Sequence, residues 1–185
     1  MSQYQDIQRV LISPEQIDQA VTRIAREIDE YYADTDKRLL LLCILKGSVV
    51  FMGDLMKKIT RPVEIDFMKV SSYGGSTETS GTIHIHLDLL RDDLNETDVL
   101  VVEDIIDSGK TLARLTEYLR LKGARTVRTC TMLDKPDRRQ VDFVPDHVGY
   151  VIPDEFVIGY GLDYAEAYRA LPFIGVLKPE VYEKA

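Results

Sequence analysis

The sequence predicts an α/β fold in which a mostly parallel central sheet is flanked by helices. Three short apolar runs, residues 39–45, 99–102 and 126–133, have the composition of strands that are buried on both faces of such a sheet. The first two runs are each followed by a polar loop and then by apolar residues at helical spacing. Because strands that alternate with helices in this way pair in parallel, we expect one layered domain over residues 1–185.

The composition limits the kind of protein that this domain can be. With 185 residues, 45% hydrophobic and 29% charged, the chain is typical of a globular protein. Its net charge of -8 argues against nonspecific binding to nucleic acid, which depends on Lys and Arg. No apolar run is long enough to cross a membrane, and the first ten residues contain no apolar signal core. Cys43 and Cys130 are isolated, so we expect reduced cysteines in a cytoplasmic protein. From the charge and the short apolar runs, we expect neither nucleic acid nor membrane as a partner.

The first predicted helix begins with a start signal. Ser13 is placed to cap the helix, Pro14 stands at its first position, and Gln16 completes a capping box with Ser13. Apolar residues at helical spacing then continue from Ile17 to Ile28. We expect this helix to support the fold rather than to carry chemistry.

The loop after the strand at 39–45 leads into a second helical stretch that runs through Met56. This loop reads Lys46-Gly47-Ser48. Lys46 is open to two interpretations: a charge that merely ends a strand, or a cation that grips a phosphate together with the backbone of the turn. The residues alone favour neither.

Two further predicted strands, 63–70 and 82–87, flank a loop at 71–81 that is too polar and glycine-rich to pack stably. The loop is either a disordered hairpin tip or an active-site lid that excludes water, and we favour the lid. His84 and His86 alternate along the second strand and therefore share one face. We expect both to be exposed side chains rather than metal ligands.

The segment with the richest chemistry is residues 99–111, VLVVEDIIDSGKT. Its apolar run predicts a strand that ends at Val102, because three carboxylates follow, those of Glu103, Asp104 and Asp107. Open α/β sheets bind ligands at the carboxyl ends of their strands. These acids therefore stand where a ligand is expected.

The second half of this segment predicts an anion site. Gly109 permits a tight turn, and apolar residues at helical spacing run from Thr111 to a stop at Gly123. A strand, a loop and a helix N-terminus in this order offer backbone N–H groups and the helix dipole to a phosphate. Because bare acids repel a phosphate, the neighbouring carboxylates indicate hydroxyls or a divalent cation as further partners.

Two other interpretations of this segment are weaker. The end Gly109-Lys110-Thr111 is similar to that of a nucleotide-binding P-loop, but GxxxxGK[ST] requires glycine at the position of Asp104. A solvated acidic turn explains the charges but not the helix that follows them.

The pattern of residues 99–111 resembles a known family. Two acids after four apolar residues, then two aliphatic residues, an acid, Ser, Gly and Thr, are typical of the phosphoribosyl pyrophosphate loop of type I phosphoribosyltransferases. Asp107 makes the loop resemble that of the relatives that act on 6-oxopurines, the hypoxanthine-guanine phosphoribosyltransferases, which carry Asp at this position. The resemblance extends from about residue 39 to residue 169 through four further motifs, Lys46-Gly47-Ser48, Ser72-Tyr73, Asp134-Lys135-Pro136, and 151–164 with Arg169.

The resemblance implies both a fold and a reaction. The type I phosphoribosyltransferase fold adds a small hood and a flexible lid hairpin to the central sheet. The reaction belongs to purine salvage: with Mg2+ as cofactor, the 5-phosphoribosyl group of phosphoribosyl pyrophosphate is transferred to N9 of hypoxanthine or guanine, giving IMP or GMP and pyrophosphate. The family usually forms homodimers or homotetramers. The sequence does not rank hypoxanthine, guanine and xanthine.

The resemblance also implies the site residues. Asp107 would be the general base at the purine N7, and the lid would contain Ser72 and Tyr73. The ribose 5-phosphate would contact Glu103, Asp104, Asp107, Ser108, Gly109, Lys110 and Thr111. The pyrophosphate would contact Lys46, Gly47 and Arg169, and the magnesium Glu103, Asp104 and Asp163. The purine would contact Ile105, Lys135, Phe156, Val157 and Asp163. In the family the peptide before the residue that matches Lys46 can be cis.

Some of these residues also have plainer interpretations. Lys135 alone reads as a surface lysine, Val157 as part of a core strand, and Asp163 with Arg169 as a surface ion pair. The alternative function is a regulatory protein that senses phosphoribosyl pyrophosphate on the same fold. We expect such a protein to carry a basic face or a nucleic-acid-binding segment, and a net charge of -8 disfavours it.

Overall fold

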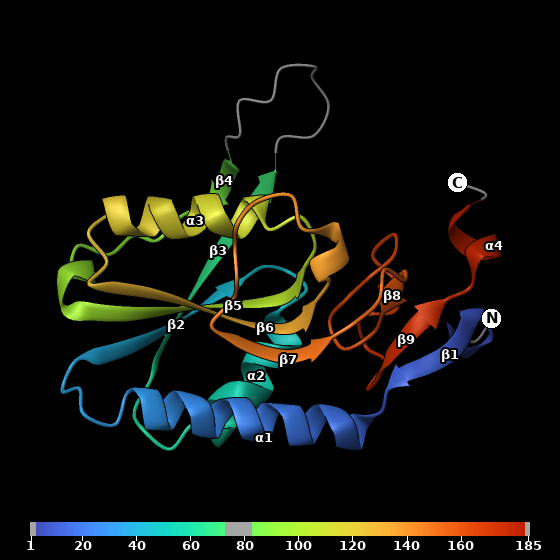
Figure 1. Cartoon of the computed structure of the whole chain (residues 1–185), viewed down its shortest axis with the longest axis horizontal. Coiled ribbons are helices and arrows are strands. Elements are labelled where there is room, and N and C mark those ends of the chain that lie inside the picture. The colour runs from blue at the N-terminus through green and yellow to red at the C-terminus, as the bar shows by residue number, and fades with distance from the viewer. Residues whose placement is uncertain (1–2, 73–82, 184–185) are drawn as a thin grey trace.

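A six-stranded sheet forms the middle layer of the protein (Figure 1). The computed structural model describes residues 3–72 and 83–183. The strand order is β4-β3-β2-β5-β6-β7, with the bounds β2 Arg38–Ile44, β3 Glu64–Ser72, β4 Ile83–Leu87, β5 Thr97–Ile106, β6 Thr126–Asp134 and β7 His147–Val151. Neighbouring strands pair in parallel except β3 with β4. The predicted mostly parallel sheet is therefore confirmed.

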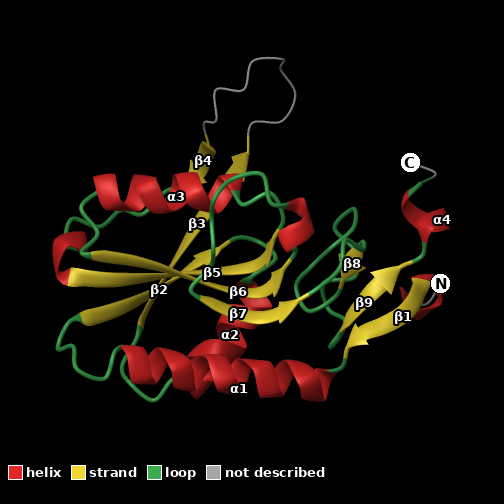
Figure 2. Cartoon of the chain, in the orientation of Figure 1, coloured by secondary structure: helices red, strands yellow, loops and turns green. Residues whose placement is uncertain are grey.

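Helices cover both faces of this sheet (Figure 2). One face carries α3, Lys110–Leu121, and the other carries α1, Pro14–Tyr31, and α2, Val49–Lys58. Strand β2 is buried on both sides because its residues alternate between the two apolar clusters, Leu39, Leu41 and Cys43 under α1 and α2, and Leu40, Leu42 and Ile44 under α3. Two short 3-10 helices, Leu94–Glu96 and Pro136–Arg138, lie in the connections between strands of this sheet, and another, Gln3–Asp6, lies near the start of the chain.

The predicted helix signals are confirmed. The N–H of Gln16 donates to Ser13 Oγ at 3.3 Å, and the N–H of Ser13 donates to Gln16 Oε1 at 2.9 Å. Together these bonds form the expected capping box of α1. Gly123 follows α3 with a φ of 96°, a left-handed conformation that suits a glycine stop.

A small antiparallel sheet brings the two ends of the chain together (Figure 1). Its order is β1-β9-β8, with the bounds β1 Ile7–Ile12, β9 Ile174–Leu177 and β8 Val157–Ile158, and the short helix α4, Pro179–Tyr182, follows β9. This sheet agrees with the small hood that the resemblance implies. The residues alone predict neither β1 nor β9, because β1 is mostly exposed and β9 has only four residues.

The structure corrects one predicted boundary. Strand β5 continues through Glu103 and Asp104 to Ile106 and does not end at Val102. Its pairing with β2 stops at Val102, whereas its pairing with β6 continues to Ile106, opposite Asp134. The two acids are therefore held within a strand, at the point where pairing along one edge has ended.

The surface and the edges of the fold agree with several smaller expectations. His84 and His86 are exposed on β4 with ring centroids 4.3 Å apart, so they share one face. Cys43 and Cys130 are buried free thiols.

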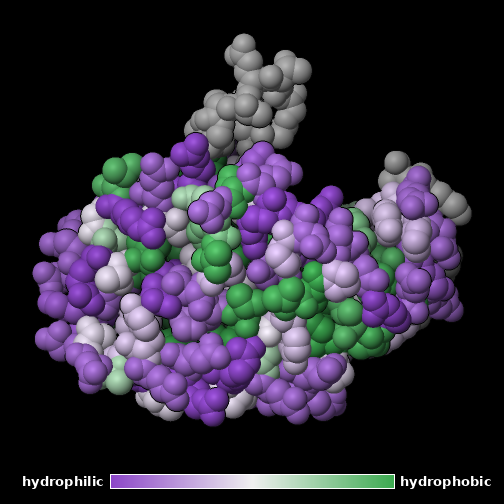
Figure 3. Space-filling model, viewed as in Figure 1, coloured by the Kyte–Doolittle hydropathy of each residue, from purple (hydrophilic) through white to green (hydrophobic). Residues whose placement is uncertain are grey.

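Most of the surface seen in Figure 3 is hydrophilic, and hydrophobic residues gather in a band towards β8 and β9. Tyr73 and the side chain of Ser72 lie outside the described residues, so the predicted lid stays a prediction. Within the described chain, no helix has the length and apolar character needed to span a membrane.

Candidate active site

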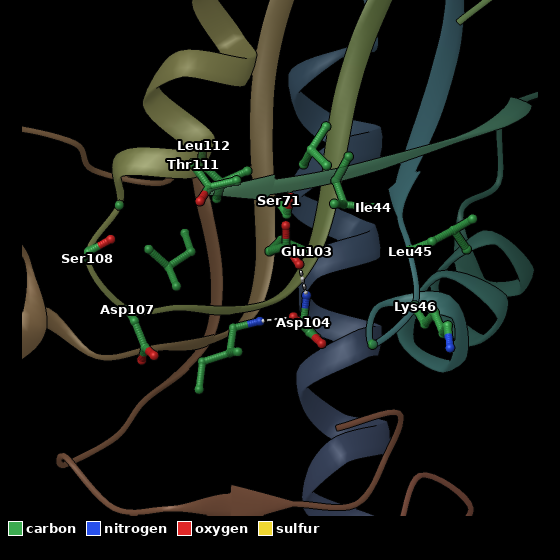
Figure 4. Close-up of a pocket in the computed structure, with 15 residues that line it drawn as sticks. Ile44, Leu45, Lys46, Ser71, Glu103, Asp104, Asp107, Ser108, Thr111 and Leu112 are labelled. Atoms are coloured by element: carbon green, nitrogen blue, oxygen red, sulfur yellow. Dashed lines mark hydrogen bonds between the residues drawn. The ribbon is translucent and has the colours of Figure 1, made fainter. Parts of the chain in front are cut away.

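A cavity of about 470 Å³ opens at the carboxyl ends of β2 and β5 (Figure 4). Open α/β sheets bind their ligands at this edge. The cavity brings together nine of the predicted site residues, Lys46, Gly47, Glu103, Asp104, Ile105, Asp107, Ser108, Gly109 and Thr111. Figure 4 shows Glu103 and Asp104 between the loop that contains Asp107 and Ser108 on one side and Lys46 on the other. Other predicted residues lie outside this lining, namely Lys110, Lys135, Phe156, Val157, Asp163 and Arg169.

The loop between β5 and α3 makes a tight turn at Gly109 and leads into the N-terminus of α3. Gly109 has a φ of 78°, and a Cβ at this position would lie 2.8 Å from Cδ of Arg139. The helix that follows begins at Lys110, whose side chain is exposed. Because the first N–H groups of a helix have no partner within it, they and the helix dipole offer a binding place for a phosphate.

Arg139 holds this loop from behind, and the sequence analysis missed it. Its guanidinium donates to the carbonyl oxygen of Asp107 at 3.0 Å and also to the carboxylate of Asp134 at the end of β6. The N–H of Gln140 donates to the carbonyl oxygen of Ser108 at 3.0 Å. The 107–111 loop, which is predicted to bind an anion, is thus fastened to the segment after β6. No sequence motif around Arg139 indicates this role.

Glu103 and Asp104 form an acid pair at the floor of the cavity. The N–H of Asp104 donates to Glu103 Oε1 at 3.3 Å, and the N–H of Ile105 donates to Asp104 Oδ1 at 2.7 Å. Burial, and then the charge of Asp104, raise the pKa of Glu103 well above its usual range, and burial also raises the pKa of Asp104. A cation or hydroxyl donors would favour the charged carboxylates and lower both pKa values.

Gly47 lies directly against this acid pair. A Cβ at position 47 would lie 1.4 Å from Asp104 Oδ2, so no other residue fits without displacing that carboxylate. On the other side, Gly161 has a φ of 99°, and its Cβ would lie 2.0 Å from the carbonyl oxygen of Gly47. The peptide between Leu45 and Lys46 is cis, as the family allows. The turn at Gly47 is thus packed between β5 and Gly161. In the sequence, the sign of this close approach is the pair of glycines in Gly159-Tyr160-Gly161.

Arg169 is joined to the turn after β2 by a network of ion pairs. Arg169 Nη1 donates to the carbonyl oxygen of Gly161 at 2.8 Å, and Arg169 Nη2 lies 2.8 Å from Asp163 Oδ1. Glu166 contacts both cations: its Oε1 lies 2.9 Å from Lys46 Nζ, and its Oε2 lies 3.3 Å from Arg169 Nη2. The ion pair between Asp163 and Arg169, which the plainer interpretation of these residues describes, is present. Glu166 was not predicted, because it belongs to no pattern that the sequence displays.

Lys135 is buried, with 5% of its surface exposed, so its interpretation as a surface lysine is wrong. Its ammonium lies 3.7 Å from Asp107 Oδ1 and 3.8 Å from Asp154 Oδ1. Its N–H donates to the carbonyl oxygen of Ile106 at 2.9 Å, which fixes the backbone beside the end of β5. A lysine is rarely buried without partners, and here the partners place its charge next to Asp107.

Phe156 and Val157 lie on the segment that leads from β7 of the central sheet into β8 of the small sheet. Val157 is buried and begins β8, which confirms the core-strand interpretation of its side chain. Phe156 is 38% exposed and stacks on Tyr182, with ring centroids 4.7 Å apart and an interplanar angle of 17°. Tyr164 packs edge-on against Phe156 at 5.6 Å. Aromatic neighbours therefore hold the Phe156 ring in place while part of it stays exposed.

The side chains of the cavity fit magnesium in their chemistry. Mg2+ prefers oxygen ligands and usually binds one or two carboxylates together with water and substrate phosphates. Glu103 and Asp104 offer two such carboxylates, whereas the carboxylate of Asp163 already accepts from Arg169 and from the N–H of Glu166. Among residues 3–72 and 83–183, no group of three or more His, Cys, Asp or Glu side chains is placed to hold a metal. This donor set is typical of a site where the substrate completes the metal ligands.

The chain belongs to the phosphoribosyl transferase domain family, whose model matches residues 13–165. It is 50% identical over 178 residues to the hypoxanthine-guanine phosphoribosyltransferase of Bacillus subtilis (strain 168), with 96% of this chain and 97% of that protein covered. It is 46% identical over 183 residues to the bifunctional protein TilS/HprT of Listeria monocytogenes serotype 4b (strain F2365). That match covers 99% of this chain, which spans 28% of the length of the bifunctional protein.

Solved structures show the same fold. A hypoxanthine phosphoribosyltransferase from Staphylococcus aureus matches with a TM-score of 0.90 and 46% identity, covering 97% of this chain and 96% of that one. A mutant of the hypoxanthine phosphoribosyltransferase from Trypanosoma cruzi, in a ternary substrates complex, matches with a TM-score of 0.90 and 36% identity, covering 97% of this chain and 100% of that one. The type I phosphoribosyltransferase fold that the resemblance implied is therefore confirmed.

Proposed function

We propose that this protein is a hypoxanthine phosphoribosyltransferase of purine salvage. It transfers the 5-phosphoribosyl group of phosphoribosyl pyrophosphate to N9 of hypoxanthine, or of guanine, and releases pyrophosphate with IMP or GMP. The observation that carries this proposal is the position of Asp107, which lies in the anion loop and 3.7 Å from the buried ammonium of Lys135. One carboxylate thus adjoins both a phosphate site and a hydrogen-bond donor suited to a purine oxygen.

The cavity supports the binding of the sugar phosphate. The backbone N–H groups from Asp107 to Thr111 would hold the 5-phosphate, because they stand at the N-terminus of α3. Glu103 and Asp104 would accept hydrogen bonds from the ribose hydroxyls, which would stabilise the charged carboxylates. The acid pair and the 107–111 loop would in this way orient the reacting carbon of the sugar.

The cations beside the cavity support the departure of pyrophosphate. Lys46 and Arg169 would bind its oxygens, since charge-assisted bonds to phosphate are strong and Arg forms two in parallel. Magnesium, when bound, neutralises developing negative charge. Glu103 and Asp104 would hold it on the ribose side, and Asp163 would contact it from the segment that carries Arg169. The lid residues Ser72 and Tyr73 would exclude water from the sugar cation.

Lys135 and Phe156 support a 6-oxopurine as the acceptor. The ammonium of Lys135 would donate to the exocyclic 6-oxygen, whereas a 6-amino group offers it hydrogens instead. Phe156 would stack on the base, and Val157 would contact its edge through backbone groups. Asp107 would take the proton at N7, which makes N9 the better nucleophile.

An assay with phosphoribosyl pyrophosphate and four bases in parallel, hypoxanthine, guanine, xanthine and adenine, tests the proposal. We expect product with hypoxanthine, guanine or both, dependence on Mg2+, and none with adenine. Activity with adenine alone would remove the role of Lys135. Absence of activity with every base, together with binding of phosphoribosyl pyrophosphate, would favour a sensor over an enzyme.

The assembly and the compartment are part of the same proposal. We expect a homodimer or homotetramer, which sedimentation of the purified protein tests directly. The buried thiols of Cys43 and Cys130 are suited to a reducing cytoplasm.

A further inference from the structure

We infer that Glu166 is a built-in competitor of pyrophosphate. Its carboxylate holds the ammonium of Lys46 and the guanidinium of Arg169 when no pyrophosphate group is bound to them. The inference rests on the proposed function, because it takes Lys46 and Arg169 as the groups that bind pyrophosphate.

The contacts of Glu166 are those of an anion shared between two loops. Lys46 follows β2 and lies 120 positions before Glu166 in the chain, yet its Nζ lies 2.9 Å from Glu166 Oε1. The other oxygen, Oε2, lies 3.3 Å from Arg169 Nη2. Each carboxylate oxygen therefore contacts a different cation, and a phosphate oxygen satisfies the same donors.

A ligand can replace Glu166 at the two cations, whereas the other two contacts that hold Arg169 are better buried and stay in place. The side chains of Glu166 and Lys46 are 66% and 51% exposed, and exposed ion pairs are weak. The side chain of Asp163 is only 29% exposed, and it holds Arg169 together with the carbonyl oxygen of Gly161. An entering pyrophosphate can thus displace Glu166 without releasing Arg169 from its other two partners.

The backbone directs Glu166 to this position. Ala165 and Glu166 have φ values of 50° and 63°, a left-handed conformation that residues other than glycine seldom adopt. The N–H of Glu166 donates to Asp163 Oδ2 at 2.9 Å and closes the turn. The pKa of Glu166 is lowered, first by its hydrogen bond with Lys46 and then by that with Arg169, so the competing group is a charged carboxylate at neutral pH.

Removing this charge leaves both cations in place for pyrophosphate. We expect Glu166→Gln to bind inorganic pyrophosphate and phosphoribosyl pyrophosphate more tightly than the wild type does. The same change slows the release of pyrophosphate, because no carboxylate is there to take back the two cations. Ribose 5-phosphate binds at the 107–111 loop, so its affinity stays unchanged.

Calorimetric titration with inorganic pyrophosphate, with and without Mg2+, tests the inference. We expect an affinity about 3- to 10-fold higher for Glu166→Gln, a gain that shrinks as salt is raised. Glu96→Gln is the matched control, because Glu96 Oε2 lies 2.8 Å from Lys37 Nζ in another exposed pair and does not line the cavity. It is expected to bind as the wild type does. In a Lys46→Met background the gain from Glu166→Gln is expected to fall, since one of the two competed cations is gone.

The outcomes separate the inference from the proposed function. Equal or weaker pyrophosphate binding by Glu166→Gln, with ribose 5-phosphate bound normally, would show that Glu166 only positions Arg169, and the inference would be wrong. An undiminished gain in the Lys46→Met background would also overturn it. A wild type that binds neither pyrophosphate nor phosphoribosyl pyrophosphate would overturn the proposed function itself.

Discussion

The two halves of the candidate site are built in different ways. The half proposed to bind the sugar phosphate comes from one continuous segment, 97–121, in which β5, the 107–111 loop and α3 follow one another. The residues proposed to bind the base come mostly from three other segments, at Lys135, at 156–157 and at Asp163, and these four residues lie outside the cavity lining. Among the predicted residues that the structure describes, the ion pair between Lys135 and Asp107 joins the two halves through side chains. A continuous segment can be interpreted from the sequence, whereas an assembled half depends on the tertiary fold.

The replacement Asp107→Asn tests whether the two halves meet at Asp107. Shape is nearly retained while the basic carboxylate is lost, so we expect kcat to fall about 10²- to 10⁴-fold with little change in the KM for phosphoribosyl pyrophosphate. Steady-state kinetics measure both constants. Asp137→Asn, an exposed change in the neighbouring 3-10 helix, is the control and should leave them unaltered. An unchanged kcat for Asp107→Asn would remove the base role.

The replacement Gly47→Ala tests the close packing on the phosphate side. Its Cβ would lie 1.4 Å from Asp104 Oδ2, so the acid or the turn must shift. Displacements of about 1 Å in an active site lower rates about 10²-fold, and we expect a loss of kcat/KM of that order. Gly53→Ala in α2 is the matched control, because its Cβ meets nothing within 4 Å. Activity close to wild type for Gly47→Ala would mean that the contact has no functional role.

The replacement Lys135→Met tests the proposed recognition of the base. Hydrogen bonds to charged groups contribute about 1.5–3 kcal/mol, so we expect the KM for hypoxanthine to rise about 10- to 100-fold. The KM for phosphoribosyl pyrophosphate should change much less, and the discrimination against adenine should weaken. Lys57→Met, at an exposed lysine paired with Asp54, serves as the control. An equal rise in both KM values would show that Lys135 only supports the anion loop.

The comparison also explains how far the sequence could be interpreted. The strand, the anion loop and the start of α3 follow from local patterns, and so do the burial of β2 and the capping box at Ser13. The end of β5 was misjudged, because pairing with β6 keeps Glu103 and Asp104 in the strand despite their charge. Local propensity cannot report a neighbouring strand.

The residues that connect distant segments of the site were missed for a related reason. Arg139, Gly161 and Glu166 act through contacts with segments that are distant in the chain, and each is an ordinary residue of a loop. The burial of Lys135 was likewise hidden, since its partners Asp107 and Asp154 are brought to it only by the fold.

The replacement Arg139→Ala tests the contact that fastens the 107–111 loop to the end of β6. Arg139 and Asp134 are largely buried, with side chains 15% and 11% exposed, so the change leaves a buried carboxylate without its partner. We expect the free energy of unfolding to fall by about 1–3 kcal/mol, as measured by urea denaturation. Arg138→Ala removes a neighbouring, half-exposed arginine and should change stability by less than about 0.5 kcal/mol. Equal effects from both variants would argue against a specific role for Arg139.

The replacement Glu103→Gln tests the electrostatic cost of the acid pair to the fold. The folded protein raises the pKa of Glu103, chiefly through burial, so it keeps the proton to a higher pH than the unfolded chain does. Stability from this group is therefore complete below the unfolded pKa and is lost as pH rises through the folded pKa. The amide side chain of the variant cannot ionise. With a chelator present, we expect the variant to gain free energy of unfolding relative to the wild type as pH rises across that window.

Urea denaturation from mildly acidic to mildly alkaline pH measures this difference, and Glu117→Gln, an exposed change on α3, supplies a baseline without the trend. A pH-independent difference between Glu103→Gln and the wild type would show that the acid pair does not destabilise the fold. The expected trend would mean that the sugar-phosphate half keeps two carboxylates at the expense of stability, which a magnesium ion or ribose hydroxyls would restore on binding. The base half, in which Lys135 already contacts Asp107 and Asp154, needs no ligand to compensate its charge.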